Sequence, residues 1–142
     1  MTKSFVIIRR MVTTGRHPTK AELQILRVLW REGPLSVRSV QTLLNEAKPT
    51  GYTSVLKTMQ IMADKGLVDR DDSVRPQLYR ARYSEDRTQK QLLADLIQRA
   101  YGGSVKALVM HAIGTRRPSP EDLAEIEQLL DRVEKVEKKE KP

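Results

Sequence analysis

The 142-residue sequence contains no cysteine. This absence excludes disulfides, thiolate metal sites and cysteine nucleophiles, and it is typical of proteins in a reducing compartment. Aromatic residues make up only 4% of the chain, so any core must be built mainly from aliphatic side chains and methionine. The length allows one or two small domains, each with a modest core.

Long hydrophobic runs are also missing. Near the start of the chain the longest apolar run is Phe5–Ile8, and Arg9 and Arg10 interrupt it. Such a run is too short for the apolar segment of a signal peptide or for a membrane span. We therefore expect a cytoplasmic protein with no membrane insertion.

Positive charge is abundant but unevenly distributed. Residues 1–83 contain 15 Lys/Arg and 7 Asp/Glu, whereas residues 84–142 contain 11 of each. The formal net charge of +8 therefore lies entirely in the first part. A basic domain joined to a neutral one suggests a polyanionic partner such as nucleic acid, although surfaces are also basic for solubility alone.

Residues 19–83 predict three helices followed by a β-hairpin. A capping box of Thr19 and Glu22 begins the first helix, Ser36 begins the second, and Gly66 ends the third. After Gly66 the apolar period changes, and Leu78–Tyr83 alternates as a half-buried hairpin strand does. Residues 1–18 show no such period, so we expect a flexible basic arm there, which either contacts phosphates or stays solvated.

Residues 84–136 predict three more helices whose apolar residues recur at spacings of three and four. Three helices of this length expose more apolar surface than they can bury among themselves, which favours pairing with a second chain over a small intramolecular bundle. The charged tail, residues 137–142, is expected to fray. The predicted dimerisation residues are Leu93, Leu96, Ile97, Leu108, Leu123, Ile126, Leu130 and Val133.

The predicted fold is mainly α with a small β-hairpin: a winged helix-turn-helix followed by a three-helix dimerisation domain. In a winged helix-turn-helix the third helix enters the major groove of DNA, so its inner face is apolar and its opening turn is small and polar. The candidate DNA-binding residues are Thr50, Tyr52, Thr53, Ser54, Lys57 and Thr58 of the third helix, Arg75 and Arg80 of the hairpin, and Arg38 of the second helix.

Three of these side chains have alternative roles. Tyr52 either contacts a phosphate or a thymine methyl group, or it packs at the start of its helix. Arg75 and Arg80 suit contacts with phosphates or with the minor groove, but they can also be solvated charges of a strand.

Several stretches resemble the BlaI/MecI penicillinase repressors and their CopY relatives. The similarity extends from Thr19 to Val133. It lies in the segments TKAELQILRVLWREGPLSVRSV, YTSVLKTMQIMADKGLV, RPQLY, YGGSVKALV and PSPEDLAEIEQLL. Each segment is a weak signal alone, but their order and spacing together are specific.

The resemblance implies a homodimeric transcriptional repressor that binds an inverted-repeat operator. It places Thr53, Ser54 and Lys57 against the DNA. In the β-lactam branch of the family, a protease of a membrane sensor system signals for cleavage of the repressor. The resemblance puts the corresponding bond between His111 and Ala112.

The sequence also departs from the family pattern. Lys57, Ile61 and Asp64 replace residues that are common in its recognition helix, and the cleaved bond of well-known members is Asn-Phe. The copper-responsive members sense copper through a cysteine cluster, which a chain without cysteine cannot form.

The sequence fits two other function classes less well, an enzyme and a winged helix that binds only protein. An enzyme is not expected, because no catalytic His/Asp/Ser set or Gly-rich phosphate loop stands out, and His111 is interpreted as a helix-packing residue. No metal or cofactor is expected. The alternative is a winged helix that binds only protein, although such modules typically lack basic and hydroxyl residues in the third helix.

Overall fold

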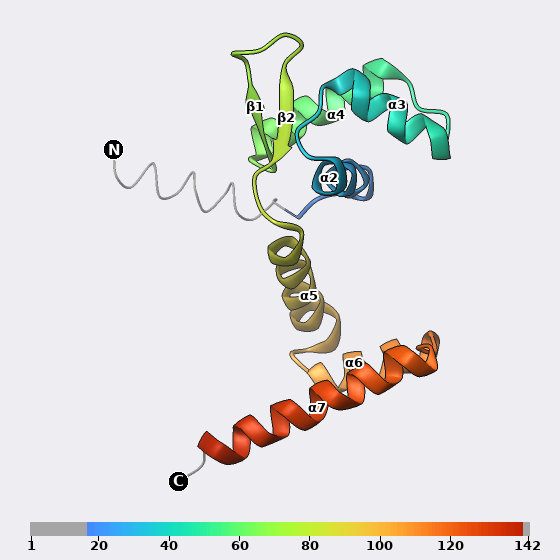
Figure 1. Ribbon diagram of the computed structural model, residues 1–142, viewed down its shortest axis with the longest axis vertical. Coiled ribbons are helices and arrows are strands. Elements are labelled where there is room, and N and C mark those ends of the chain that lie inside the picture. Colours follow the sequence, from blue (N-terminus) through green and yellow to red (C-terminus); the bar gives the residue numbers. More distant parts are fainter. Residues whose placement is uncertain (1–16, 141–142) are drawn as a thin grey trace. The chain divides into compact units, whose positions relative to one another are not determined.

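The computed structural model describes residues 17–140, with the backbone alone for residues 137–140 (Figure 1). Within this range the chain forms six helices and one two-stranded antiparallel sheet, so the mainly helical prediction is confirmed. The chain divides into two compact units, one ending at Leu93 and one beginning at Ala94. The predicted arm lies outside the described residues, except for His17 and Pro18.

The first unit contains the three predicted helices, α2 (Lys20–Glu32), α3 (Val37–Ala47) and α4 (Tyr52–Lys65). Both sides of the predicted capping box are formed. The Thr19 hydroxyl accepts from the Glu22 N–H at 3.2 Å, and the Glu22 carboxylate accepts from the Thr19 N–H at 2.9 Å. Ser36 caps α3, and Gly66 ends α4 with a left-handed φ of +81°.

The hairpin consists of β1 (Val68–Asp71) and β2 (Leu78–Ala81), with Asp69 directly opposite Arg80. The loop between α2 and α3 is paired with this hairpin. Leu35 and Tyr79 exchange two backbone hydrogen bonds, of 3.0 and 2.8 Å. Three helices followed by this hairpin make the first unit a winged helix-turn-helix, as predicted (Figure 1).

The core of the first unit is aliphatic apart from one tyrosine. Val40, Met59 and Met62 are completely buried, and Tyr79 is 1% exposed. The Trp30 Nε1–H donates to the backbone carbonyl of Tyr83 at 2.9 Å, which fixes the chain after β2 to the end of α2. The core residues are Ile25, Leu26, Leu29, Val37, Val40, Val55, Met59, Met62, Leu67, Val68 and Tyr79.

The remaining helices are α5 (Glu85–Tyr101), α6 (Val105–Thr115) and α7 (Pro120–Glu140). The boundary between the two units falls within α5, whereas the predicted domain boundary lies before it. α7 continues to Glu140, and the fraying expected after Val136 stays a prediction. Glutamate and lysine favour the helical state, and this segment contains little else.

Apolar side chains of α6 and α7 are left without a core. No residue of α6 is buried, and α6 and α7 make few contacts with each other. The small intramolecular bundle that we considered is therefore not formed by these two helices. Among residues 17–140, no helix is long and apolar enough to cross a membrane.

Candidate nucleic-acid interface

The helix α4 has one buried face and one solvent-facing side. Val55, Met59 and Met62 are buried against α2, α3 and the hairpin. Because an α-helix turns by about 100° per residue, the side opposite these three residues carries a different set of side chains. That outer face consists of Thr53, Lys57, Gln60, Ile61 and Asp64, all of which are exposed.

The amino-terminal end of α4 carries no side-chain cap. Its N-cap residue is Gly51, and no side chain of the described residues hydrogen-bonds to the cap. The first N–H groups of a helix lack partners within the helix, and the helix dipole makes this end positive. The end of α4 can therefore accept an anionic group such as a DNA phosphate.

Thr50 is held by the loop before α4. Its hydroxyl donates to the carbonyl of Lys48 at 2.7 Å, and its N–H donates to Asn45 Oδ1 at 2.9 Å. Its own carbonyl accepts from Gln41 Nε2 at 2.9 Å. Thr50 is half-buried by these contacts, which orient the start of α4.

Ser54 and Thr58 lie on the flank of α4 rather than on its outer face. The half-buried Thr58 hydroxyl donates to the Ser54 carbonyl at 2.9 Å. Together with Thr50, both side chains line a cavity of about 320 Å³ between α2, α3 and α4. Of the six residues predicted on this helix and its start, Thr53 and Lys57 face outward most directly.

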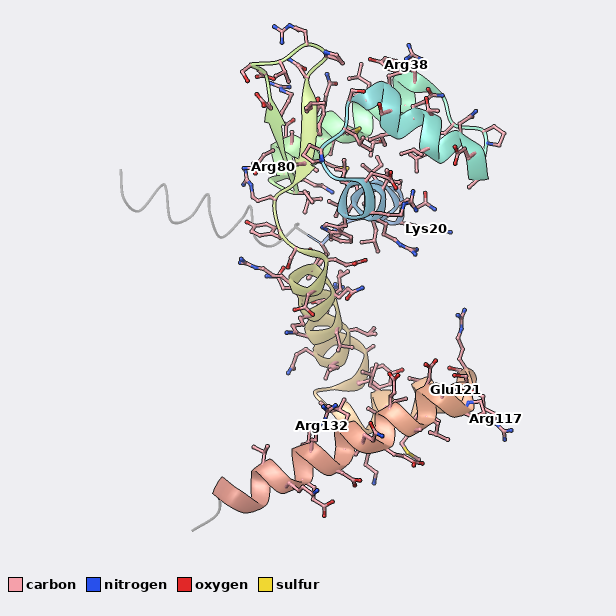
Figure 2. All side chains as sticks on the ribbon, in the orientation of Figure 1. Lys20, Arg38, Arg80, Arg117, Glu121 and Arg132 are labelled. Atoms are coloured by element: carbon pink, nitrogen blue, oxygen red, sulfur yellow. The ribbon has the colours of Figure 1, made fainter. Side chains whose placement is uncertain are left out.

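Tyr52 and Arg38 form a stacked pair at the start of α3 and α4. The Arg38 guanidinium carbon lies 4.3 Å from the centroid of the Tyr52 ring, within the range of a cation–π contact. Both side chains remain exposed. We predicted the two residues separately, but the structure stacks them beside the open end of α4. Arg38 lies near the start of α3 (Figure 2).

The β1–β2 hairpin is the wing of the fold. In its turn, the Arg75 side chain hydrogen-bonds to backbone carbonyls of the turn itself. The Arg75 Nη1 donates to the carbonyl of Asp72 at 2.9 Å and to that of Val74 at 3.3 Å. In the same turn, the Asp71 carboxylate accepts from the hydroxyl and the N–H of Ser73. These hydrogen bonds, led by the hydroxyl, lower the pKa of Asp71 below its ordinary value of 3.8.

Aspartates pair with arginines of the two strands and with Arg82, which directly follows β2. Arg82 donates twice to one oxygen of Asp69, at 2.7 and 2.9 Å, and Arg80 lies 3.8 Å from the other oxygen. Arg70 is 2.7 Å from Asp72. The hydrogen bond to Asp69 raises the pKa of Arg82 above its ordinary value.

These pairs neutralise much of the positive charge of the hairpin. Residues 68–83 contain four arginines and three aspartates. Arg80 is nevertheless well exposed, with 70% of its side chain accessible (Figure 2). Asp69 was missed as a member of this surface because its role depends on the strand register, which a four-residue strand does not specify by its sequence.

The bond between His111 and Ala112 lies inside α6. The Tyr101 hydroxyl is 3.2 Å from His111 Nδ1, and the two rings meet edge to face. The Ala112 carbonyl accepts from the Arg116 N–H at 3.2 Å, so the backbone at this bond is held in the helix. Among the side chains that the structure describes, residues 17–136, there is no cluster suited to a metal ion.

The family model for the penicillinase repressor matches residues 18–132 of the chain. The chain belongs to this family. The family and the winged-helix fold are those of DNA-binding regulators of transcription, which are not enzymes. No curated protein sequence matches it significantly.

Solved structures of other transcriptional regulators are also similar to this chain. Staphylococcus aureus MarR in complex with salicylate and kanamycin is 13% identical, with a TM-score of 0.49 over 99% of this chain and 91% of that one. Sco5413, a MarR family regulator from Streptomyces coelicolor, is 16% identical, with a TM-score of 0.43 over 99% and 95%. Reduced AbfR bound to DNA is 18% identical, with a TM-score of 0.41 over 95% and 85%.

Proposed function

We propose that the protein represses transcription as a homodimer on an inverted-repeat operator, with α4 of each protomer in the major groove of one half-site. The observation that carries this proposal is the exposed outer face of α4, with Thr53 and Lys57, above a fully buried inner face. Arg38 and Tyr52 flank the open end of the helix, and Arg75 and Arg80 supply phosphate contacts from the wing.

The homodimer is supported by the apolar residues of α5, α6 and α7. None of the eight predicted dimerisation residues is buried in the single chain. Leu130 and Val133 are 62% and 58% exposed, and Leu123 is 40% exposed on the same helix. Contiguous exposed apolar residues at helical spacing mark a surface for association. Two-fold symmetry of the dimer then requires an operator with the same symmetry.

Release from DNA by proteolysis between His111 and Ala112 is the second part of the proposal. A protease of a membrane sensor system would act on this bond, which lies in a helix without buried residues. Such a helix opens locally at low free energy, so the bond can become accessible without global unfolding. Cleavage would separate α7 from the DNA-binding unit and weaken the dimer.

Selection of DNA from a random duplex library tests the central proposal. The full-length protein should enrich a two-fold symmetric motif. In fluorescence anisotropy it should bind that motif about 10³-fold more tightly than scrambled DNA, with an affinity that falls steeply with salt. Failure to enrich any motif would overturn the proposal in favour of a winged helix that binds protein only.

Light scattering tests the homodimer. The protein should have twice its chain mass of 16.3 kDa. Leu130→Glu should shift it toward the monomer, because it introduces a charge into the proposed interface. Gln128→Glu on the same helix is the matched control and should leave the mass unchanged. A monomeric wild-type protein would contradict this part of the proposal.

A further inference from the structure

Ile61 is an aliphatic residue on the otherwise polar outer face of α4. The residue is 42% exposed, and it belongs neither to the buried core nor to the residues packed against that core. A single exposed aliphatic side chain is common on protein surfaces, so exposure alone assigns no role. The position of Ile61 among the DNA-facing residues is what calls for an explanation.

Thr53, Lys57 and Ile61 follow one another at intervals of four residues along the outer face. With a rise of 1.5 Å per residue, each interval spans about 6 Å and the three residues span about 12 Å. The major groove is about 12 Å wide, and successive base pairs are about 3.4 Å apart. If Lys57 meets a base edge, Ile61 therefore lies about two base pairs further along the groove.

The chemistry of the side chain restricts what Ile61 can contact there. Isoleucine has no hydrogen-bond donor or acceptor, so it cannot bind a phosphate or the polar edge of a base. Asp64, one turn further along the same face, repels phosphates and disfavours placing this part of α4 against the DNA backbone. The apolar group that bases present in the major groove is the C5-methyl group of thymine.

We propose that Ile61 is a specificity-determining residue that packs on the C5-methyl group of a thymine in each operator half-site. This inference rests on the proposed binding of α4 in the major groove. Burial of one methyl group is worth about 0.8 kcal/mol, which corresponds to a fourfold change in affinity. Operator sequences with another base at this position should bind correspondingly more weakly.

The experiment replaces each thymine of the selected operator in turn with deoxyuridine, which removes only the methyl group. At one symmetric pair of positions, the wild-type protein should lose roughly fourfold in affinity for each half-site. Ile61→Ala should bind the thymine and deoxyuridine operators equally, because the partner of the methyl group is gone. The difference between the two proteins is a coupling energy that changes in base stacking do not produce.

Two variants control for indirect effects. Gln60→Ala, on the neighbouring position of the same face, should keep the wild-type preference for thymine. Ile61→Val, which retains methyl groups at this position, should keep part of it. Because Gln60 and Ile61 are both exposed, none of these changes should alter the thermal unfolding midpoint appreciably.

The outcomes separate this inference from the proposed function. A wild-type protein that selects no DNA motif would overturn the proposed function. A protein that binds its motif specifically but loses no affinity with any deoxyuridine would overturn the role of Ile61 alone. An equal loss in wild type and Ile61→Ala would also overturn it, since the methyl group would then act through the DNA or another residue.

Discussion

Lys65, the last residue of α4, donates from Nζ to both carboxylate oxygens of Glu22, at 2.9 and 3.0 Å. Glu22 is 3% exposed, and its carboxylate also accepts a hydrogen bond from the Thr19 N–H. The helix dipole favours acidic groups at the start of a helix and basic groups at its end. Glu22, in the first turn of α2, and Lys65, in the last turn of α4, both have the favourable charge. One carboxylate therefore closes the cap of α2 and fixes the end of α4.

Replacing Lys65 by methionine should lower the free energy of unfolding by about 2 kcal/mol, because it leaves the buried Glu22 carboxylate without its counter-charge. The loss should stay below that of a fully buried pair, since the Lys65 side chain is 28% exposed. Urea unfolding at one fixed protein concentration measures this change.

The same substitution at Lys90 is the matched control. Lys90 pairs with Asp86 on α5, where both side chains are about three-quarters exposed. Lys90→Met should change the free energy of unfolding by no more than about 0.5 kcal/mol. Equal losses at Lys65 and Lys90 would show that the Glu22–Lys65 pair has no special role.

Lys57→Ala should weaken binding to the selected operator by about 1–3 kcal/mol and change binding to scrambled DNA little, if Lys57 contacts a guanine. Anisotropy titrations with both duplexes measure the two affinities. Lys90→Ala removes the same charge from outside the proposed interface and should affect neither. Equal losses on both duplexes would instead make Lys57 a phosphate contact.

Asp69→Asn should strengthen binding to scrambled DNA, because it removes the carboxylate that engages Arg80 and Arg82. The freed guanidinium groups should add phosphate contacts and make the logarithmic salt dependence steeper by about one unit. Asp86→Asn adds the same charge on α5 and is the control. A salt dependence that is the same for both variants would show that the wing arginines do not contact phosphates.

Ser73→Ala should raise the pKa of Asp71 toward 3.8, because the hydroxyl is the main cause of its low value. A carboxyl group whose pKa is lowered by folding stabilises the folded state above its unfolded pKa. This contribution is lost as the pH falls through the folded pKa, so the wing turn should weaken only below about pH 4. An NMR titration of the Asp71 carboxyl carbon measures the shift, with Ser39→Ala as the control. An unchanged pKa would contradict the assignment.

Local signals in the sequence predicted the elements of the first unit well. Thr19, Ser36 and Gly66 act through hydrogen bonds and dihedral angles within a few residues, so their roles can be inferred without knowledge of the fold. Ser104 was missed as the cap of α6, although its hydroxyl accepts from the Ala107 N–H at 3.1 Å.

Contacts between distant residues could not be predicted in this way. The pairing of Glu22 with Lys65 and that of Leu35 with Tyr79 join residues far apart in the chain. The local sequence does not distinguish Glu22 and Lys65 from solvated charges. Nor does it distinguish Leu35 from an ordinary residue of a loop. The candidate DNA-binding residues were identified by their polar or basic side chains in the predicted third helix and hairpin. The division of α4 into an outer face and a flank required knowledge of how α4 packs against α2, α3 and the hairpin.

The aspartates of the wing have a consequence for how a repressor finds its site. In a genome, every stretch of DNA competes for the protein through its phosphates, and this competition grows with each free positive charge. Asp69 and Asp72 hold Arg82 and Arg70 in ion pairs, so phosphates must displace a carboxylate before they gain these contacts. This pairing therefore lowers mainly the nonspecific affinity for DNA, which does not depend on the base sequence. If the protein acts as proposed, fewer molecules are retained at unrelated sites, and a smaller number of them is enough to occupy the operator.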